Sequence, residues 1–165
     1  MVEWIARAGA GGGATRRALD VAMGRGRHAV LLARAGFLTF GVDLAFDAVR
    51  GAMAAAAAEG APIHGWCADL TQHPLPRRRF DVLLVSRYLQ RNLFPGLRGA
   101  VAPGGIVIYE TFTTSQRLLR RPPTSDDHLL EPGELRRHFE GFDVLFYDEV
   151  VAPEAMARLV ARSRS

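Results

Sequence analysis

The sequence predicts an α/β fold in which a doubly wound, mostly parallel sheet is covered by helices on both faces. Strand-like segments alternate with segments of helical spacing from Arg17 onward, which is typical of parallel sheets. Residues 80–85 are continuously apolar, as strands buried on both faces are. The last two strand-like segments, 143–150 and 157–162, have no helix between them, so we expect an antiparallel hairpin at the C-terminal edge of the sheet.

Each element follows from its spacing and from the residues that end it. A helical turn at 2–7 and a Gly/Ala-rich segment at 8–15 predict that 1–15 is a short flexible lead. Gly36 ends the first long helix, Gly60 and Pro62 end the second, and Pro103-Gly104-Gly105 end the third. Residues 110–130 form a long polar connection. The expected strands are 18–21, 37–42, 63–66, 80–85, 106–109, 143–150 and 157–162, and the expected helices are 26–35, 45–59, 93–101 and 132–140.

The composition favours one cytoplasmic domain spanning residues 1–165, with 48% hydrophobic residues to form its core. No apolar run is long enough to span a bilayer, and residues 1–10 lack the pattern of a secretory signal. The single cysteine, Cys67, rules out an internal disulfide. All 21 basic side chains are arginine, and they are interleaved with acids rather than gathered in one tract. We therefore expect a small, anionic substrate and no nucleic-acid or membrane partner, with a homodimer left open.

A glycine-rich turn, Asp20-Val21-Ala22-Met23-Gly24-Arg25-Gly26, joins the first strand to the first long helix. Small residues there let the backbone approach a ligand, and the start of the helix offers free N–H groups. Asp43 ends the second strand about 20 residues downstream, where an acid binds ribose hydroxyls. The pattern predicts a nucleoside-bearing cofactor. The alternative is that Gly24 and Gly26 only make a tight turn.

Two residues of this turn favour S-adenosylmethionine over a dinucleotide. Ala22 stands where a dinucleotide fingerprint has its first glycine, and the Asp20 carboxylate would repel a pyrophosphate. The same carboxylate suits the cationic amino-acid end of S-adenosylmethionine. Arg27 and His28 oppose the helix dipole, so we expect an anion nearby, either Asp20, the methionine carboxylate or the substrate. Alternatively, Arg27 is solvated and His28 packs on the sheet.

The chain resembles the class I S-adenosylmethionine-dependent methyltransferases over nearly its whole length. The residues that carry the resemblance are Asp20…Gly24-Arg25-Gly26-Arg27-His28, Gly41-Val42-Asp43, Ala68-Asp69-Leu70, Phe80-Asp81-Val82 and Pro103-Gly104-Gly105. Residues 134–142 are similar to the tellurite-resistance (TehB-like) methyltransferase branch in particular. Two features differ from the family: Ala22 replaces a glycine, and the turn around Pro153 is short.

The resemblance implies a seven-stranded Rossmann-like sheet of strand order 3-2-1-4-5-7-6. It implies that the turn from Asp20 to Gly26 holds the methionine part, that Asp43 binds the ribose and that Asp69 contacts the adenine amino group. The cofactor-binding residues expected in this way are Asp20, Ala22, Met23, Gly24, Arg25, Gly26, His28, Asp43, Leu44, Ala68, Asp69, Leu70 and Ser86.

The chemistry is expected beyond the fourth strand, since ligands lie at the carboxyl ends of parallel strands. Arg87 and Arg91 are four residues apart and would share one helical face, where they could hold an anionic substrate, with Tyr88 as a lid or hydrogen-bond donor. Glu110, after the fifth strand, would face the sulfonium or act as a base. The alternative is a solvated first turn of a helix.

The loop within 110–130 is expected to cover the substrate, with Arg117 and His128 as secondary candidates, or else to be a mobile surface loop. No metal site is expected, because His64 and Cys67 point to opposite faces of a strand. The sequence thus predicts methyl transfer to a small, anionic or soft nucleophile (EC 2.1.1.-). A non-catalytic S-adenosylmethionine-binding protein is the alternative, and Asp20 and Ala22 count against a nicotinamide-linked oxidoreductase.

Overall fold

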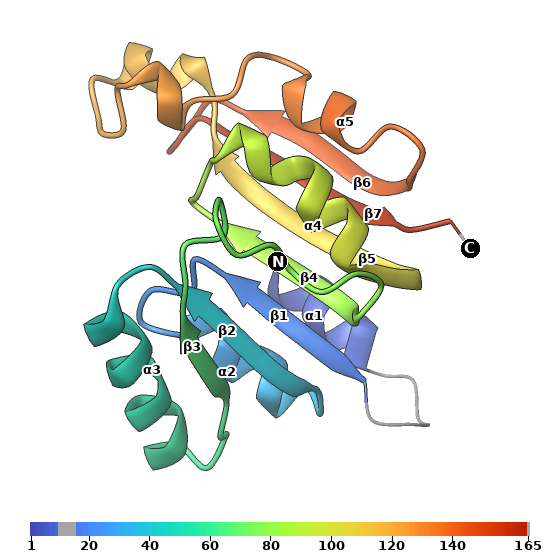
Figure 1. The fold of residues 1–165 in the computed structure, drawn as a ribbon. Coiled ribbons are helices and arrows are strands. Elements are labelled where there is room, and N and C mark those ends of the chain that lie inside the picture. Colours follow the sequence, from blue (N-terminus) through green and yellow to red (C-terminus); the bar gives the residue numbers. More distant parts are fainter. Residues whose placement is uncertain (10–15, 165) are drawn as a thin grey trace.

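The computed structural model describes residues 1–9 and 16–164, which form one seven-stranded sheet with helices on both faces (Figure 1). The strand order is β3-β2-β1-β4-β5-β7-β6, as expected. Strands β1 to β5 run parallel, and β7 lies antiparallel to both of its neighbours. The strands are β1 Arg17–Val21, β2 Leu38–Asp43, β3 His64–Cys67, β4 Phe80–Ser86, β5 Val101–Phe112, β6 Asp143–Val150 and β7 Met156–Arg162.

Two helical layers enclose this sheet. The α-helices are α1 Val2–Gly9, α2 Arg27–Arg34, α3 Phe46–Ala58, α4 Phe94–Ala100 and α5 Glu134–His138, and the 3-10 helices are η1 Arg91–Leu93, η2 Thr114–Leu119 and η3 Asp126–His128. On one face, Val82 and Leu84 of β4 pack in a cluster with residues of α1 and α2. On the other face, Leu83 and Val85 pack in a cluster with residues of α4 and α5. The continuous apolar run of β4 is thus explained by burial on both sides.

The N-terminal segment differs from the expected flexible lead. Residues 2–9 form α1, and Ile5 is only 2% exposed in the core cluster that includes Leu32 of α2. Met1, Trp4, Ile5 and Ala8 pack in this cluster because they recur at the three- and four-residue spacing of an amphipathic helix. The rest of the expected lead, residues 10–15, lies outside the described residues. No helix in the described part of the chain is long and apolar enough to cross a membrane.

Strand β5 and the connection after it also differ from expectation. The Pro103-Gly104-Gly105 sequence indicates a break, yet β5 begins at Val101, and its pairing with β4 passes through a register shift between Phe80 and Val82. A bulge of this kind accommodates residues that cannot continue a regular ladder. The expected polar connection begins only after Phe112 and contains the short helices η2 and η3.

Candidate cofactor and acceptor site

The turn between β1 and α2 is built from left-handed backbone. Ala22, Gly24 and Gly26 have φ angles of 54°, 52° and 75°. The Met23 N–H donates to the Val42 carbonyl at 3.1 Å, which ties the turn to the end of β2. A left-handed alanine costs about 1–2 kcal/mol relative to the usual backbone, so Ala22 carries strain that a glycine would not. Strain held at such a turn is typical of a ligand site.

The two glycines of this turn have different roles. A Cβ built on Gly26 would lie 2.8 Å from the Ala52 Cβ, so Gly26 allows α2 to pack closely against α3. A Cβ built on Gly24 would meet nothing within 4 Å. The space above Gly24 is therefore open to a ligand. Met23, by contrast, is buried, and it packs under Gly41, whose Cβ would lie 2.1 Å from the Met23 Sδ. Only its backbone is available to a cofactor.

Asp43 holds the turn and the start of α3 together. Its Oδ2 accepts the Gly24 N–H at 2.8 Å, and its Oδ1 accepts the Ala45 N–H at 3.0 Å. Each carboxylate oxygen has a second lone pair, so Asp43 can still accept hydrogen bonds from two hydroxyl groups. The residue expected to bind ribose thus also positions the glycine-rich turn.

A cavity of about 220 Å³ opens at the carboxyl ends of β1, β2 and β3. It brings together six residues that the sequence predicts to bind the cofactor, and it adds Tyr88, which the sequence places in catalysis. Its lining residues are Val21, Ala22, Val42, Asp43, Leu44, Ala68, Asp69, Leu70 and Tyr88. Hydrogen bonds from the Thr71 hydroxyl and N–H hold the pKa of Asp69 below its usual value, so Asp69 is an anionic acceptor at this cavity.

Asp20 is the most unusual group of the site. It is 2% exposed, and its Oδ2 has no hydrogen-bond partner among the described residues. Burial and, to a lesser extent, the nearby Asp43 raise the pKa of Asp20 to about 7, although the Ala29 N–H and Arg27 oppose the shift. Within the described part of the chain, the Oδ2 of this buried carboxyl therefore lacks a hydrogen-bonding partner. Such a partner would fit at this position.

His28 and Arg25, also expected at the cofactor, lie at the start of α2. His28 is partly buried, and burial together with Arg27 lowers the pKa of its imidazole. Its ring lies 3.3 Å from the Arg27 guanidinium. The imidazole is therefore neutral near pH 7 and can bind only through hydrogen bonds. Arg25 is exposed.

The catalytic candidates are distributed over several contacts. The Ser86 hydroxyl donates to Glu110 at 2.9 Å across the ends of β4 and β5. Arg87 forms an ion pair with Glu154. Arg91 does not line the cofactor cavity: its Nε donates to Glu134 at 2.6 Å and its Nη2 to the Leu129 carbonyl at 2.7 Å. Arg91 thus ties η1 to the loop before α5, and its donors are used for structure.

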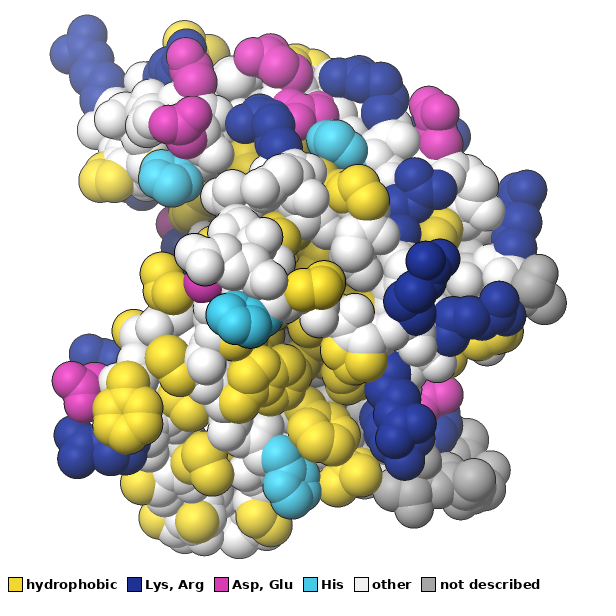
Figure 2. All heavy atoms as spheres, in the orientation of Figure 1, with side chains coloured by type: hydrophobic (Ala, Val, Ile, Leu, Met, Phe, Trp, Pro, Cys, Tyr) yellow, Lys and Arg dark blue, Asp and Glu magenta, His cyan; other side chains and the backbone are white. Residues whose placement is uncertain are grey.

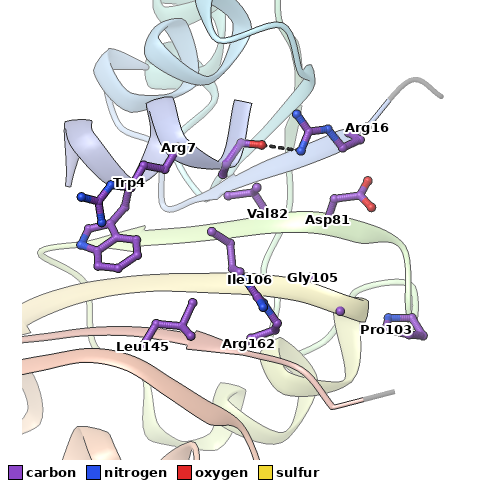
Figure 3. A pocket seen from close by; sticks show the side chains of 12 residues that line it. Trp4, Arg7, Arg16, Asp81, Val82, Pro103, Gly105, Ile106, Leu145 and Arg162 are labelled. Atoms are coloured by element: carbon purple, nitrogen blue, oxygen red, sulfur yellow. Dashed lines mark hydrogen bonds between the residues drawn. The ribbon is translucent and has the colours of Figure 1, made fainter. Parts of the chain in front are cut away.

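A further cavity, of about 390 Å³, lies at the opposite end of the sheet (Figure 3). Arg16 and Arg162 line it together with Asp81, at the start of β4, and Gly105, in the first half of β5. Arg16 donates to the carbonyl groups of Ala8 and Gly9 at the end of α1. Because ligands of parallel sheets bind at the carboxyl ends of the strands, this cavity is not part of the cofactor site.

These features define a Rossmann-like protein with a nucleoside-sized cavity at the carboxyl ends of its parallel strands. A sequence family described as a methyltransferase domain matches residues 18–105, just over half of the chain, and the chain belongs to this family. The family assignment gives no support to a nicotinamide-linked oxidoreductase. No curated protein matches the chain.

Several solved structures share the fold. A S-adenosylmethionine-dependent methyltransferase from Mesorhizobium loti is similar with a TM-score of 0.75 and 20% identity, over 98% of each chain. TehB from Haemophilus influenzae has a TM-score of 0.76 and 15% identity; the match covers 92% of this chain and 58% of TehB. The (4+2)-cyclase SpnF has a TM-score of 0.77 and 17% identity, over 99% of this chain and 79% of SpnF. At these identities the likeness shows the fold and not a shared substrate.

Proposed function

We propose that the chain is a S-adenosylmethionine-dependent methyltransferase that acts on a small molecule, with residues 1–165 as one cofactor-binding domain. Membership of the methyltransferase-domain family implies this cofactor. The observation that carries the proposal is the buried Asp20 carboxyl, whose unpaired Oδ2 lies beside a strained, open glycine turn. An ammonium group bound there would give the carboxylate the partner that it lacks.

The residues present fit the parts of this cofactor in turn. Asp20 would hold the ammonium group, the two free acceptor positions of Asp43 would take the ribose hydroxyls, and Asp69 would accept the adenine amino group. Leu44 and Leu70 would enclose the base from the cavity wall. When bound, S-adenosylmethionine supplies an electrophilic methyl group on a sulfonium. The remaining task of the chain is to align an acceptor and exclude water.

The tellurite-resistance branch is supported only by the short resemblance of residues 134–142 and by a TehB fold match at 15% identity. We therefore propose the general activity and not tellurite as the substrate. Binding of the cofactor without methyl transfer is a second candidate function, and the pairing of Glu110 with Ser86 favours it, because this carboxylate is held by a neighbouring hydroxyl.

Calorimetry with S-adenosylhomocysteine, S-adenosylmethionine and NADH tests the cofactor. We expect the first two to bind with micromolar affinity and NADH not to bind. The Gly24→Val variant should lose this binding, because a side chain would enter the open space above the turn. Gly36→Val is a matched control: Gly36 is also left-handed and open, with a φ of 87°, but lies before β2 at the other end of the sheet.

Loss of binding in both glycine variants, or in neither, would contradict the assignment of the turn. A panel of candidate acceptors, with release of S-adenosylhomocysteine as the signal, then separates an enzyme from a binding protein. Turnover of any acceptor excludes the non-catalytic alternative.

A further inference from the structure

A cavity of about 470 Å³, the second one at the carboxyl ends of the strands, adjoins the proposed cofactor cavity and shares Tyr88 with it. It lies beyond the carboxyl ends of β4 and β5, under the loop that follows β5. Its lining residues are Arg87, Tyr88, Leu89, Thr111, Phe112, Pro122, Pro123 and His128. Its volume lies within the range of small-molecule sites. If the proposed function holds, this is where the methyl acceptor binds.

The fixed positive charge in this cavity is already neutralised. Arg87 is the one arginine in the lining, and its two terminal nitrogens donate to the two carboxylate oxygens of Glu154, one of them at 3.0 Å. Its guanidinium carbon lies 5.3 Å from the centre of the Phe112 ring. A bidentate pair of this kind satisfies both the charge and the donor geometry of an arginine. An anionic acceptor would have to compete with Glu154.

The other arginines expected near the acceptor are also paired with carboxylates. Arg91 is held by Glu134, and Arg117 forms an ion pair with Asp126. The sequence favours an anionic acceptor because these arginines follow β4 and β5. The carboxylate partners of these arginines lie far along the chain or in the loop itself. Because the arginines are paired with them, their positions no longer favour an anionic acceptor.

The rest of the lining is apolar or uncharged. Leu89 and Phe112 are buried, and Pro122 and Pro123 complete a hydrophobic wall. Tyr88, Thr111 and His128 are groups of the lining that can form hydrogen bonds with a hydroxyl. Figure 2 shows one face of the molecule, on which hydrophobic side chains gather over the half that contains β1, β2 and β3, while arginine side chains lie along the right edge and at the upper and lower left.

We propose that the acceptor is an uncharged, largely apolar molecule that carries a hydroxyl or thiol group, and that Glu154 determines this selectivity by neutralising Arg87. Transfer of an anion into this cavity would leave two negative charges on one guanidinium, at a desolvation cost that a neutral molecule avoids. The inference rests on the proposed function, but it concerns the second cavity only.

The test uses two probes with the same ring system, 2-naphthol, which is uncharged near pH 7, and 2-naphthoate, which is an anion. Their affinities for the full chain are measured by equilibrium dialysis with saturating S-adenosylhomocysteine. We expect 2-naphthol to bind at least about tenfold more tightly. In Glu154→Gln, Arg87 is left without its carboxylate, so the affinity for 2-naphthoate should rise and the preference should fall by about fivefold or more.

Glu59→Gln is the matched control, because Glu59 forms an exposed ion pair with Arg34 that is far from this cavity. It should leave the preference unchanged, and thermal unfolding shows whether each variant is folded. The inference is overturned if 2-naphthoate binds the natural chain as tightly as 2-naphthol, if neither probe binds, or if Glu154→Gln leaves the preference as it was. Failure of S-adenosylhomocysteine to bind overturns the proposed function instead, and the probes are then compared without it.

Discussion

Replacing Asp20 by asparagine should stabilise the folded chain by an amount that grows with pH. Burial raises the pKa of Asp20 from 3.8 to about 7, so the folded state binds a proton more tightly than the unfolded state. Stability is therefore lost as the pH rises from about 4 to about 7. Well above pH 7 the loss from this one group is about 4 kcal/mol, from about 3 pKa units at about 1.4 kcal/mol each.

The informative quantity is the difference in unfolding free energy between Asp20→Asn and the natural chain. Asparagine does not titrate, so the contributions of all other groups cancel to first order. Between about pH 5 and pH 8 the difference should increase by about 2–3 kcal/mol, because part of the loss has already occurred below pH 5. The asparagine amide of the variant has its own free-energy cost of burial beside the unpaired position. This cost does not change with pH, so it does not affect the pH dependence of the difference.

Urea denaturation without cofactor measures this difference at several pH values. With a slope of about 2 kcal/mol per molar urea, the separation of the two midpoints should grow by about 1 M across the range. Asp47→Asn is the matched control, since Asp47 is exposed on α3 and pairs with Arg50. Its difference should stay constant with pH. A constant difference for Asp20→Asn as well would refute the raised pKa and the reasoning built on it.

Three further outcomes are expected. The affinity for S-adenosylhomocysteine should weaken about tenfold from pH 8 to pH 6 by calorimetry, because binding an ammonium group requires ionised Asp20; the same affinity in Asp20→Asn should not vary in this way. Ala22→Gly should raise the unfolding free energy by up to about 1 kcal/mol by relieving the left-handed alanine, whereas Ala54→Gly in α3 should lower it by about 1 kcal/mol; equal effects would argue against strain at Ala22. Arg91→Met should lower the unfolding free energy by about 2–3 kcal/mol, with S-adenosylhomocysteine binding retained, because Glu134 keeps its charge without its partner. Although burial opposes it, the Arg91, Glu131 N–H and His138 hydrogen bonds hold the pKa of Glu134 at about 2, so this effect should be full above about pH 4.5 and vanish as the pH falls towards 2. Unchanged stability in Arg91→Met would restore a direct role in binding the acceptor.

The mostly parallel sheet and the meeting of distant residues at its strand ends follow from local sequence signals. Apolar runs mark the strands, and the parallel arrangement places the strand ends together, so Ala22, Asp43 and Asp69 meet although they are far apart in the chain. The resemblance to a known family added the strand order. The prediction of the fold succeeded because strand patterning does not depend on side-chain partners.

The roles of the arginines could not be predicted in the same way. Arg87 pairs with a glutamate 67 residues away, and Arg91 with one 43 residues away. No periodicity or motif marks such pairs, because they depend on where the β6–β7 turn and α5 are placed by the whole fold. For this reason no sequence pattern marks Glu154, which lies in that turn. The sequence alone does not distinguish an arginine that is paired with a carboxylate from one that is free to bind a ligand.

The candidate cofactor turn combines two unfavourable features. Ala22 has a left-handed backbone, and the buried Asp20 carboxyl has an Oδ2 without a hydrogen-bond partner among the described residues. Neither feature benefits the folded chain alone, yet a ligand with an ammonium group would relieve the electrostatic cost as it binds. A residue that lowers stability at a buried position is best explained by binding, since packing would favour an uncharged side chain there. The destabilising effect of the buried Asp20 carboxyl is therefore the strongest physical argument that this turn binds a cationic cofactor.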